Sequence, residues 1–67
     1  MPPTVTLPTL LDIDQLARHL GTSHRHIRRL IADKRIPYVK VGRLIRFDPA
    51  EIGAWLNESR VVKAGRI

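Results

Sequence analysis

The sequence contains no cysteine, and its aromatic residues are one tryptophan, one tyrosine and one phenylalanine. Without cysteine the chain can form neither a disulfide nor a thiolate–metal site, so its stability must come from an aliphatic core. No apolar run approaches the roughly 18 residues of a membrane span. No basic segment followed by an apolar one indicates a signal peptide. We therefore expect a cytoplasmic protein that makes no contact with a membrane.

Acidic residues are also scarce. The 67 residues include six aspartates and glutamates and 12 lysines and arginines, which gives a net charge of +6. Nine basic residues fall between Arg18 and Arg46, where Asp33 is the one acid. Such a block attracts a polyanion, and DNA and RNA are the usual examples. RNA-specific domains usually stack bases on exposed aromatic side chains. Because the few aromatic residues here are expected in the core, the composition favours DNA.

The length allows one small domain with short tails. Residues 1–9 are rich in proline and threonine and are predicted to be a disordered N-terminal tail. We place the folded domain at residues 10–58 and a C-terminal tail at residues 59–67.

The first predicted helix covers residues 13–20. Asp12 is placed as its N-cap, and Gln15, three residues later, completes a capping box. Apolar residues recur with helical spacing at Ile13, Leu16, Ala17 and Leu20. Gly21 supplies the left-handed residue that often ends a helix. About three residues separate this helix from the next one, a spacing that indicates a helix-turn-helix.

The second predicted helix follows Ser23, which is its N-cap, and ends near Asp33. One apolar stripe holds it in the core: Ile27, Leu30 and Ile31. At about 100° per residue, Arg25 and Arg29 project opposite this stripe and Arg28 lies on its shoulder. A helix that is anchored on one side and covered with arginine on the other is typical of a helix that enters the DNA major groove.

Residues 38–41 and 44–47 predict a two-stranded hairpin with Arg43 at its tip. A two-residue turn at Gly42 and Arg43 is one register, and a three-residue loop that also includes Leu44 is the other. We favour the three-residue loop because burial specifies register. It puts the apolar side chains on one face, namely Val39, Val41, Ile45 and Phe47. It leaves the basic side chains on the opposite face, namely Lys40 and Arg46.

The third predicted helix begins at Pro49, with Asp48 as N-cap and Glu51 in the first turn. Its apolar stripe consists of Ile52, Trp55 and Leu56. We expect Trp55 to fill the core rather than to stack on a base. Because the helix carries acids and no basic residue through residue 58, we expect it to face away from a polyanion.

From Leu10 to Leu56 the chain resembles the phage and mobile-element excisionases that have a MerR-like winged helix-turn-helix. The matching signals are Leu16-Ala17, Leu20-Gly21, Ser23 at the start of a basic helix, Ile36-Pro37, Val41-Gly42-Arg43, Arg46-Phe47 and Ala54-Trp55-Leu56. The resemblance implies a small α+β fold in the order helix, helix, two-stranded wing, helix.

The resemblance also implies a function. Excisionases of this kind are recombination directionality factors that bind repeated sites in the arm of an attachment site, bend the DNA, often assemble side by side, and help a tyrosine integrase. Two alternatives remain open: a small phage or mobile-element transcriptional regulator of the same fold, and an integrase-binding adaptor with only nonspecific affinity for DNA.

Three groups of side chains are predicted to contact DNA. The recognition-helix group is Ser23, Arg25, His26, Arg28 and Arg29. The wing group is Lys40, Arg43 and Arg46, in which Arg43 is placed for a minor groove. The backbone group is Arg18, Lys34 and Arg35.

No enzymatic activity, metal or cofactor is predicted. The N-caps are assigned to Asp12, Ser23 and Asp48. No evident pair of side chains then remains for general acid–base catalysis. His24 and His26 differ by about 200° around a helix and cannot share an ion, and His19 lies across the turn.

Overall fold

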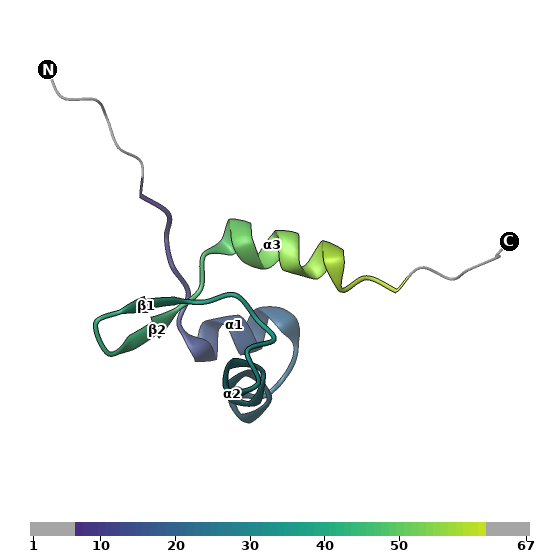
Figure 1. Ribbon diagram of the computed structural model, residues 1–67, viewed down its shortest axis with the longest axis horizontal. Helices are drawn as coiled ribbons and strands as arrows, with labels where there is room; N and C mark the ends of the chain where they lie inside the picture. Colours follow the sequence, from purple (N-terminus) through teal and green to yellow (C-terminus); the bar gives the residue numbers. More distant parts are fainter. Residues whose placement is uncertain (1–6, 62–67) are drawn as a thin grey trace, which may run out of the picture.

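The computed structural model describes residues 7–61, which form three helices and one two-stranded antiparallel sheet. The elements, in order, are α1 (Ile13–Leu20), α2 (His24–Ala32), β1 (Val39–Val41), β2 (Leu44–Arg46) and α3 (Pro49–Glu58). Figure 1 shows α1 and α2 on one side of the domain, α3 on the other, and the strands projecting as a wing. This is the predicted small α+β winged helix-turn-helix. The outer parts of both predicted tails, residues 1–6 and 62–67, lie outside the described residues.

Each helix begins at the cap that its sequence predicts. In α1 the Asp12 carboxylate accepts from the Gln15 backbone N–H at 2.7 Å, and the Gln15 side chain accepts from the Asp12 N–H at 2.9 Å. In α2 the hydroxyl of Ser23 accepts from the backbone N–H of His26 at 3.1 Å. In α3 the Asp48 carboxylate accepts from a first-turn backbone N–H at 3.0 Å. These bonds satisfy donors that a helix start otherwise leaves unpaired.

The core lies where α1, α2, α3 and the base of the wing meet. It consists of Leu16, Ala17, Ile27, Leu30, Ile36, Phe47 and Ile52. At its centre Leu16 is 1% exposed, and Ile27 and Phe47 are fully buried. The stripes predicted for α1 and α2 therefore supply most of the core, and Ile52 is the buried contribution of α3.

A short backbone pairing ties the start of the domain to the end of the wing. The Leu11 N–H donates to the Phe47 carbonyl at 2.9 Å, and the Phe47 N–H donates to the Leu11 carbonyl at 2.8 Å. An isolated two-stranded hairpin is at best marginally stable in water. Through this bridge a third backbone segment, which lies directly before α1, pairs with the base of the wing.

The wing closes by the two-residue turn, so the favoured three-residue loop is wrong. Val41 pairs with Leu44, Lys40 with Ile45, and Val39 with Arg46 in the antiparallel ladder. Gly42 has φ +62° and Arg43 has a negative φ, which is the pattern of a type II′ turn. A three-residue loop would have required a left-handed conformation at Leu44, which is costly for a branched side chain.

The register changes which wing residues face the helices. Side chains alternate along each strand, and directly paired residues share a face. Ile45 packs against the core, so its partner Lys40 lies on the same face, and Val41 and Leu44 lie on the opposite face. Lys40 is nevertheless exposed, since a lysine stem can run along apolar surface while its ammonium group reaches water.

Trp55 is half-buried and packs against the core, but it is not a fully enclosed plug. Its indole N–H donates to the backbone carbonyl of Arg35 at 2.8 Å. Trp55 therefore fixes α3 to the segment that follows α2, through both an apolar contact and a directed bond.

The end of α2 contains a conformation that the sequence did not indicate. Lys34 adopts a left-handed φ of +54°, and the Lys34 and Arg35 N–H groups donate to the carbonyls of Ile31 and Leu30. This pattern is a Schellman motif, in which glycine is the usual left-handed residue. Gly21 plays that part at the end of α1, with φ +68°.

We therefore expect Lys34→Gly to stabilise the domain. A left-handed conformation costs a non-glycine residue about 1–2 kcal/mol, and the larger entropy of glycine in the unfolded chain offsets about 0.4–1 kcal/mol of that gain. Urea unfolding should show a net increase of about 0.5 kcal/mol in the free energy of unfolding. The control, Ala54→Gly within α3, should lose about 1 kcal/mol. A loss in Lys34→Gly would show that its side chain makes a stabilising contact.

Candidate nucleic-acid interface

The outer face of α2 carries four of the five predicted recognition residues. Ser23, Arg25, His26 and Arg29 surround one shallow hollow on this face, and all four are exposed. On the opposite side of the helix Ile27 and Leu30 are buried. Because its apolar side is buried in the core, the helix has a fixed orientation and presents its arginines on the outer face.

Arg28, the fifth predicted recognition residue, faces a groove between α2 and the wing. Arg43 and Arg46 from the wing and His24 from the first turn of α2 line the same groove. The structure thus brings Arg28 together with wing residues that the sequence assigned to a separate group. This groove lies between α2 and the wing, and Asp12 and Asp14 line it beside the basic residues.

The residues of the groove that were not predicted as parts of the site are Asp12, Ile13, Asp14, His24, Leu44 and Ile45. Nδ1 of His24 lies 2.6 Å from Oδ1 of Asp14, so the ring donates to the carboxylate and links the first turns of α1 and α2. Both side chains remain substantially exposed. The two residues are ten positions apart, and no periodic pattern in the sequence pairs them.

Arg46 differs from its predicted placement. It was expected to share an outward face with Lys40, but the two-residue turn puts these side chains on opposite faces of the wing. Arg46 is half-buried, and its guanidinium donates to the carbonyl of Ile45 at 2.8 Å. Arg43 and Lys40 are both exposed, and Arg43 occupies the second position of the turn.

The three predicted backbone contacts are not gathered at one place. Lys34 and Arg35 are exposed immediately after α2. Arg18 is exposed on α1, where it shares a separate hollow with Gln15 and His19. The structure therefore extends the basic surface to the end of α2, whereas Arg18 stands apart from the groove beside the wing.

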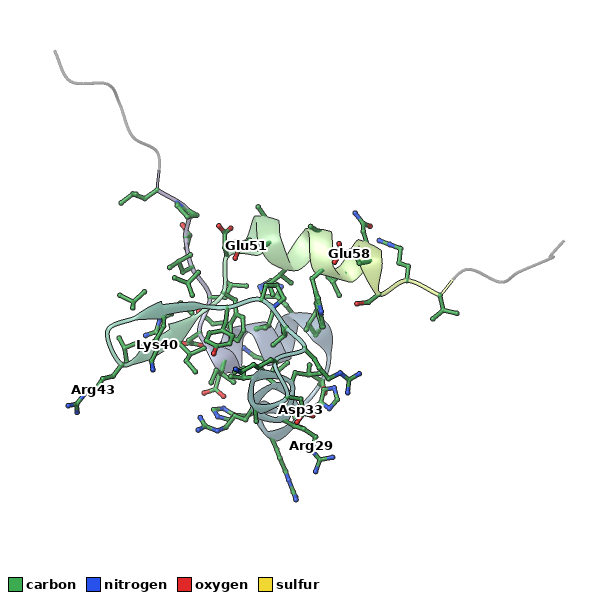
Figure 2. The ribbon with its side chains drawn as sticks, in the orientation of Figure 1. Arg29, Asp33, Lys40, Arg43, Glu51 and Glu58 are labelled. Carbon is green, nitrogen blue, oxygen red and sulfur yellow. The ribbon has the colours of Figure 1, made fainter. Side chains whose placement is uncertain are left out.

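Positive charge is concentrated on α2 and the wing, although Asp12 and Asp14 line the groove between them and Asp33 caps the end of α2. Figure 2 shows Arg29 pointing away from α2 and Arg43 pointing away from the wing tip, both on the side remote from α3. Glu51 and Glu58 lie on α3. The excess of arginine on α2 and the wing favours contact with a polyanion there rather than at α3.

The residues that build this arrangement also match a known family. Residues 10–60 match the family described as a helix-turn-helix domain. The chain belongs to the helix-turn-helix domain family. It is a DNA-binding helix-turn-helix protein, and α2 is the second helix of the motif, the one that enters the major groove in such domains. Neither the curated proteins nor the solved structures compared with the chain give a match.

Two further findings concern residues 7–61 of this helix-turn-helix protein. None of their helices has the length and apolar character that crossing a bilayer requires. The same residues contain no cluster of three histidine, cysteine, aspartate or glutamate side chains with a geometry for metal binding.

The contact between α1 and α2 gives this helix-turn-helix protein an acid-sensitive element. The hydrogen bond from His24 holds the pKa of Asp14 below its ordinary value of 3.8, and the charges of His24 and Arg18 act in the same direction. A carboxyl whose pKa is lower in the folded state stabilises the fold above its unfolded pKa. That contribution is lost as the pH falls through the folded pKa.

We therefore expect Asp14→Asn to lower the melting temperature at about pH 5, with a difference from the wild type that shrinks below about pH 3. Thermal unfolding followed by circular dichroism across this range measures it. Glu51→Gln, which alters an exposed acid on α3, is the matched control. A difference that stays constant down to the lowest pH would contradict the stabilising role of the ionised Asp14.

Proposed function

We propose that this protein is an excisionase, an architectural factor that binds and bends attachment-site DNA and so directs integrase-mediated recombination toward excision. The observation that carries the proposal is the set of arginines on α2, in the groove and on the wing, with Glu51 and Glu58 of α3 on the other side. Two basic elements on one side can contact adjacent grooves of one duplex, a geometry that favours bending. The resemblance of residues 10–56 to excisionases supports the same conclusion.

In this proposal α2 lies in the major groove. Arginine can donate two hydrogen bonds to guanine O6 and N7, which makes Arg25, Arg28 and Arg29 the candidate base readers. Ser23 and His26, at the start of the helix, are placed for base edges or phosphate. Arg43 enters the adjacent minor groove, whose negative potential attracts arginine where the groove is narrow.

The remaining predicted residues act on the phosphate backbone in this proposal. They are Arg18, Lys34, Arg35, Lys40 and Arg46. Such contacts fix the position of the protein on the duplex and contribute affinity that falls with salt. The half-buried Arg46 differs from the others because its guanidinium is already bonded to the wing backbone, which fixes its direction.

The proposal includes two protein partners and no catalytic chemistry in this chain. A tyrosine integrase would supply strand cleavage, and copies of this protein would bind side by side on repeated sites. The protein would act without a cofactor on DNA in the cytoplasm of a bacterial host. Its role is to shape the DNA for the recombination complex.

A titrated gel-shift and circular-permutation assay at two salt concentrations tests this function. The probe is the attachment-site arm of the source element, or a duplex selected from random DNA. The proposal predicts laddered, cooperative complexes with a bend, and stimulation of excision when integrase and a recombination substrate are added. A single unbent complex on promoter-like DNA would instead indicate the transcriptional regulator. Loss of sequence preference at physiological salt would indicate the integrase-binding adaptor.

A further inference from the structure

The wing tip exposes an apolar pair that the core does not use. Val41 and Leu44 are 49% and 54% exposed, and they face each other in the ladder next to the turn. Directly paired side chains have Cβ atoms about 4.5–5.5 Å apart, so the two form one continuous apolar surface. Ile45 packs against the core from the other face of the wing, so the pair lies on the face that carries Arg46. On this face Leu44 lines the groove between the wing and α2, together with Arg28.

The surroundings of the pair are basic. Arg43 precedes Leu44 at the tip and is exposed, and Arg46, paired with Val39, lies on the same face of the ladder as Leu44. The minor groove of DNA combines strong negative potential with apolar sugar walls and base steps, and proteins that bend DNA from this side insert apolar side chains there. A leucine framed by arginines is complementary to that environment.

The base of the wing is fixed strongly enough to deliver such a side chain. Phe47 is fully buried at the end of the wing, and it pairs with Leu11 through two backbone hydrogen bonds. The tip is closed by a tight two-residue turn with Gly42 at φ +62°. Leu44 is therefore presented from a short hairpin whose position relative to α2 is set by the core.

We propose that Leu44, supported by Val41, is a wedge that enters a base step in the minor groove and kinks the DNA. The inference rests on the proposed function and adds the residue that produces the bend. Arg43 supplies electrostatic attraction to the groove, and Leu44 supplies apolar contact with the partly unstacked bases.

A second copy of this chain is a less suitable occupant of the wing tip. Stable protein interfaces bury about 1,200–2,000 Å² in total, and two side chains at a hairpin tip supply a small part of that area. Arg43 beside the pair would also repel another chain with a net charge of +6. DNA is negatively charged, so it attracts Arg43 instead of repelling it.

The test compares Leu44→Thr with the wild-type protein on one duplex. Threonine keeps a good strand propensity while it removes the apolar extension. We expect the bend angle in circular permutation to fall by about half or more and affinity to fall about tenfold, with the salt dependence unchanged. Leu44→Met should retain the bend. Leu56→Gln, which alters an exposed leucine on α3, should change neither quantity.

A second readout detects unstacking directly. With 2-aminopurine at the kinked step, wild-type binding should raise the fluorescence and Leu44→Thr should not. Arg43→Ala should lower the salt slope by about one, which separates its charge from the role of Leu44. An unchanged bend and fluorescence in a DNA-bound, folded Leu44→Thr would overturn the wedge and leave the proposed function standing. Absence of DNA binding by the wild type would overturn both.

Discussion

Replacing Phe47 with alanine is expected to unfold the domain. The side chain is fully buried in the core, and it occupies the point where the wing, the Leu11 bridge and the start of α3 meet. Deleting a buried phenylalanine side chain typically costs about 3–5 kcal/mol, because transfer energy is lost and a cavity remains. A chain of 67 residues has a total stability of about 3–10 kcal/mol. The expected loss is thus comparable with the whole stability of the protein.

Urea unfolding followed by circular dichroism measures this effect. We expect Phe47→Ala either to be unfolded without denaturant or to lose most of its free energy of unfolding. Leu44→Ala is the matched control, because Leu44 is more than half exposed and should cost well under 1 kcal/mol. A loss below about 1 kcal/mol in Phe47→Ala would contradict the core described for this domain.

The second large effect is expected in DNA binding when Arg25 and Arg29 are both replaced with alanine. Each arginine that reads a base contributes about 1–3 kcal/mol to specific binding. Together they predict a loss of about 30-fold to 20,000-fold in affinity for the preferred duplex. Since both side chains are exposed and line the same hollow on α2, the fold should be unaffected.

The control for the double variant is Arg60→Ala. Arg60 follows α3, and its Nε donates to the Asn57 side chain at 3.0 Å, so the same type of residue is removed from the opposite side of the domain. Binding isotherms with preferred and scrambled duplexes should show that the double variant loses site preference as well as affinity. Equal affinity of the double variant and the wild type would remove α2 from the recognition surface.

The parts of the fold that depend on local chemistry could be predicted from the sequence. Asp12, Ser23 and Asp48 are caps because their side chains satisfy nearby backbone donors, and such contacts span two or three residues. The bounds of α1 follow from Asp12 and Gly21 on the same grounds. The apolar stripes of α1 and α2 then predict most of the core.

The wing register shows where pattern alone is insufficient. Separation of apolar from basic side chains favoured a three-residue loop, but the conformational cost at Leu44 outweighs the benefit of hiding Val41. The exposed apolar pair at the tip is the direct result. The backbone conformation that the turn allows thus determined the register, although hydrophobic patterning favoured the other one.

The candidate site was predictable only in part for a different reason. Helical periodicity predicts that the arginines of α2 lie outside the core. It also places Arg28 on the shoulder of the apolar stripe, and in the structure this shoulder faces the groove between α2 and the wing. His24 and Asp14 meet through the crossing of two helices, and the angle of that crossing is not encoded in any short spacing. The left-handed Lys34 was likewise hidden, since glycine is the usual signal for that conformation.

The most direct test of the central claim is an NMR titration of the ¹⁵N-labelled protein with the preferred DNA duplex. The account predicts that the amide shifts concentrate in α2 (His24–Ala32), in the wing and in the groove between them, whereas α3 (Pro49–Glu58) is unaffected. Shifts confined to α3, or to the apolar groove between α1 and α3 that Leu20 and Leu56 line, would contradict it.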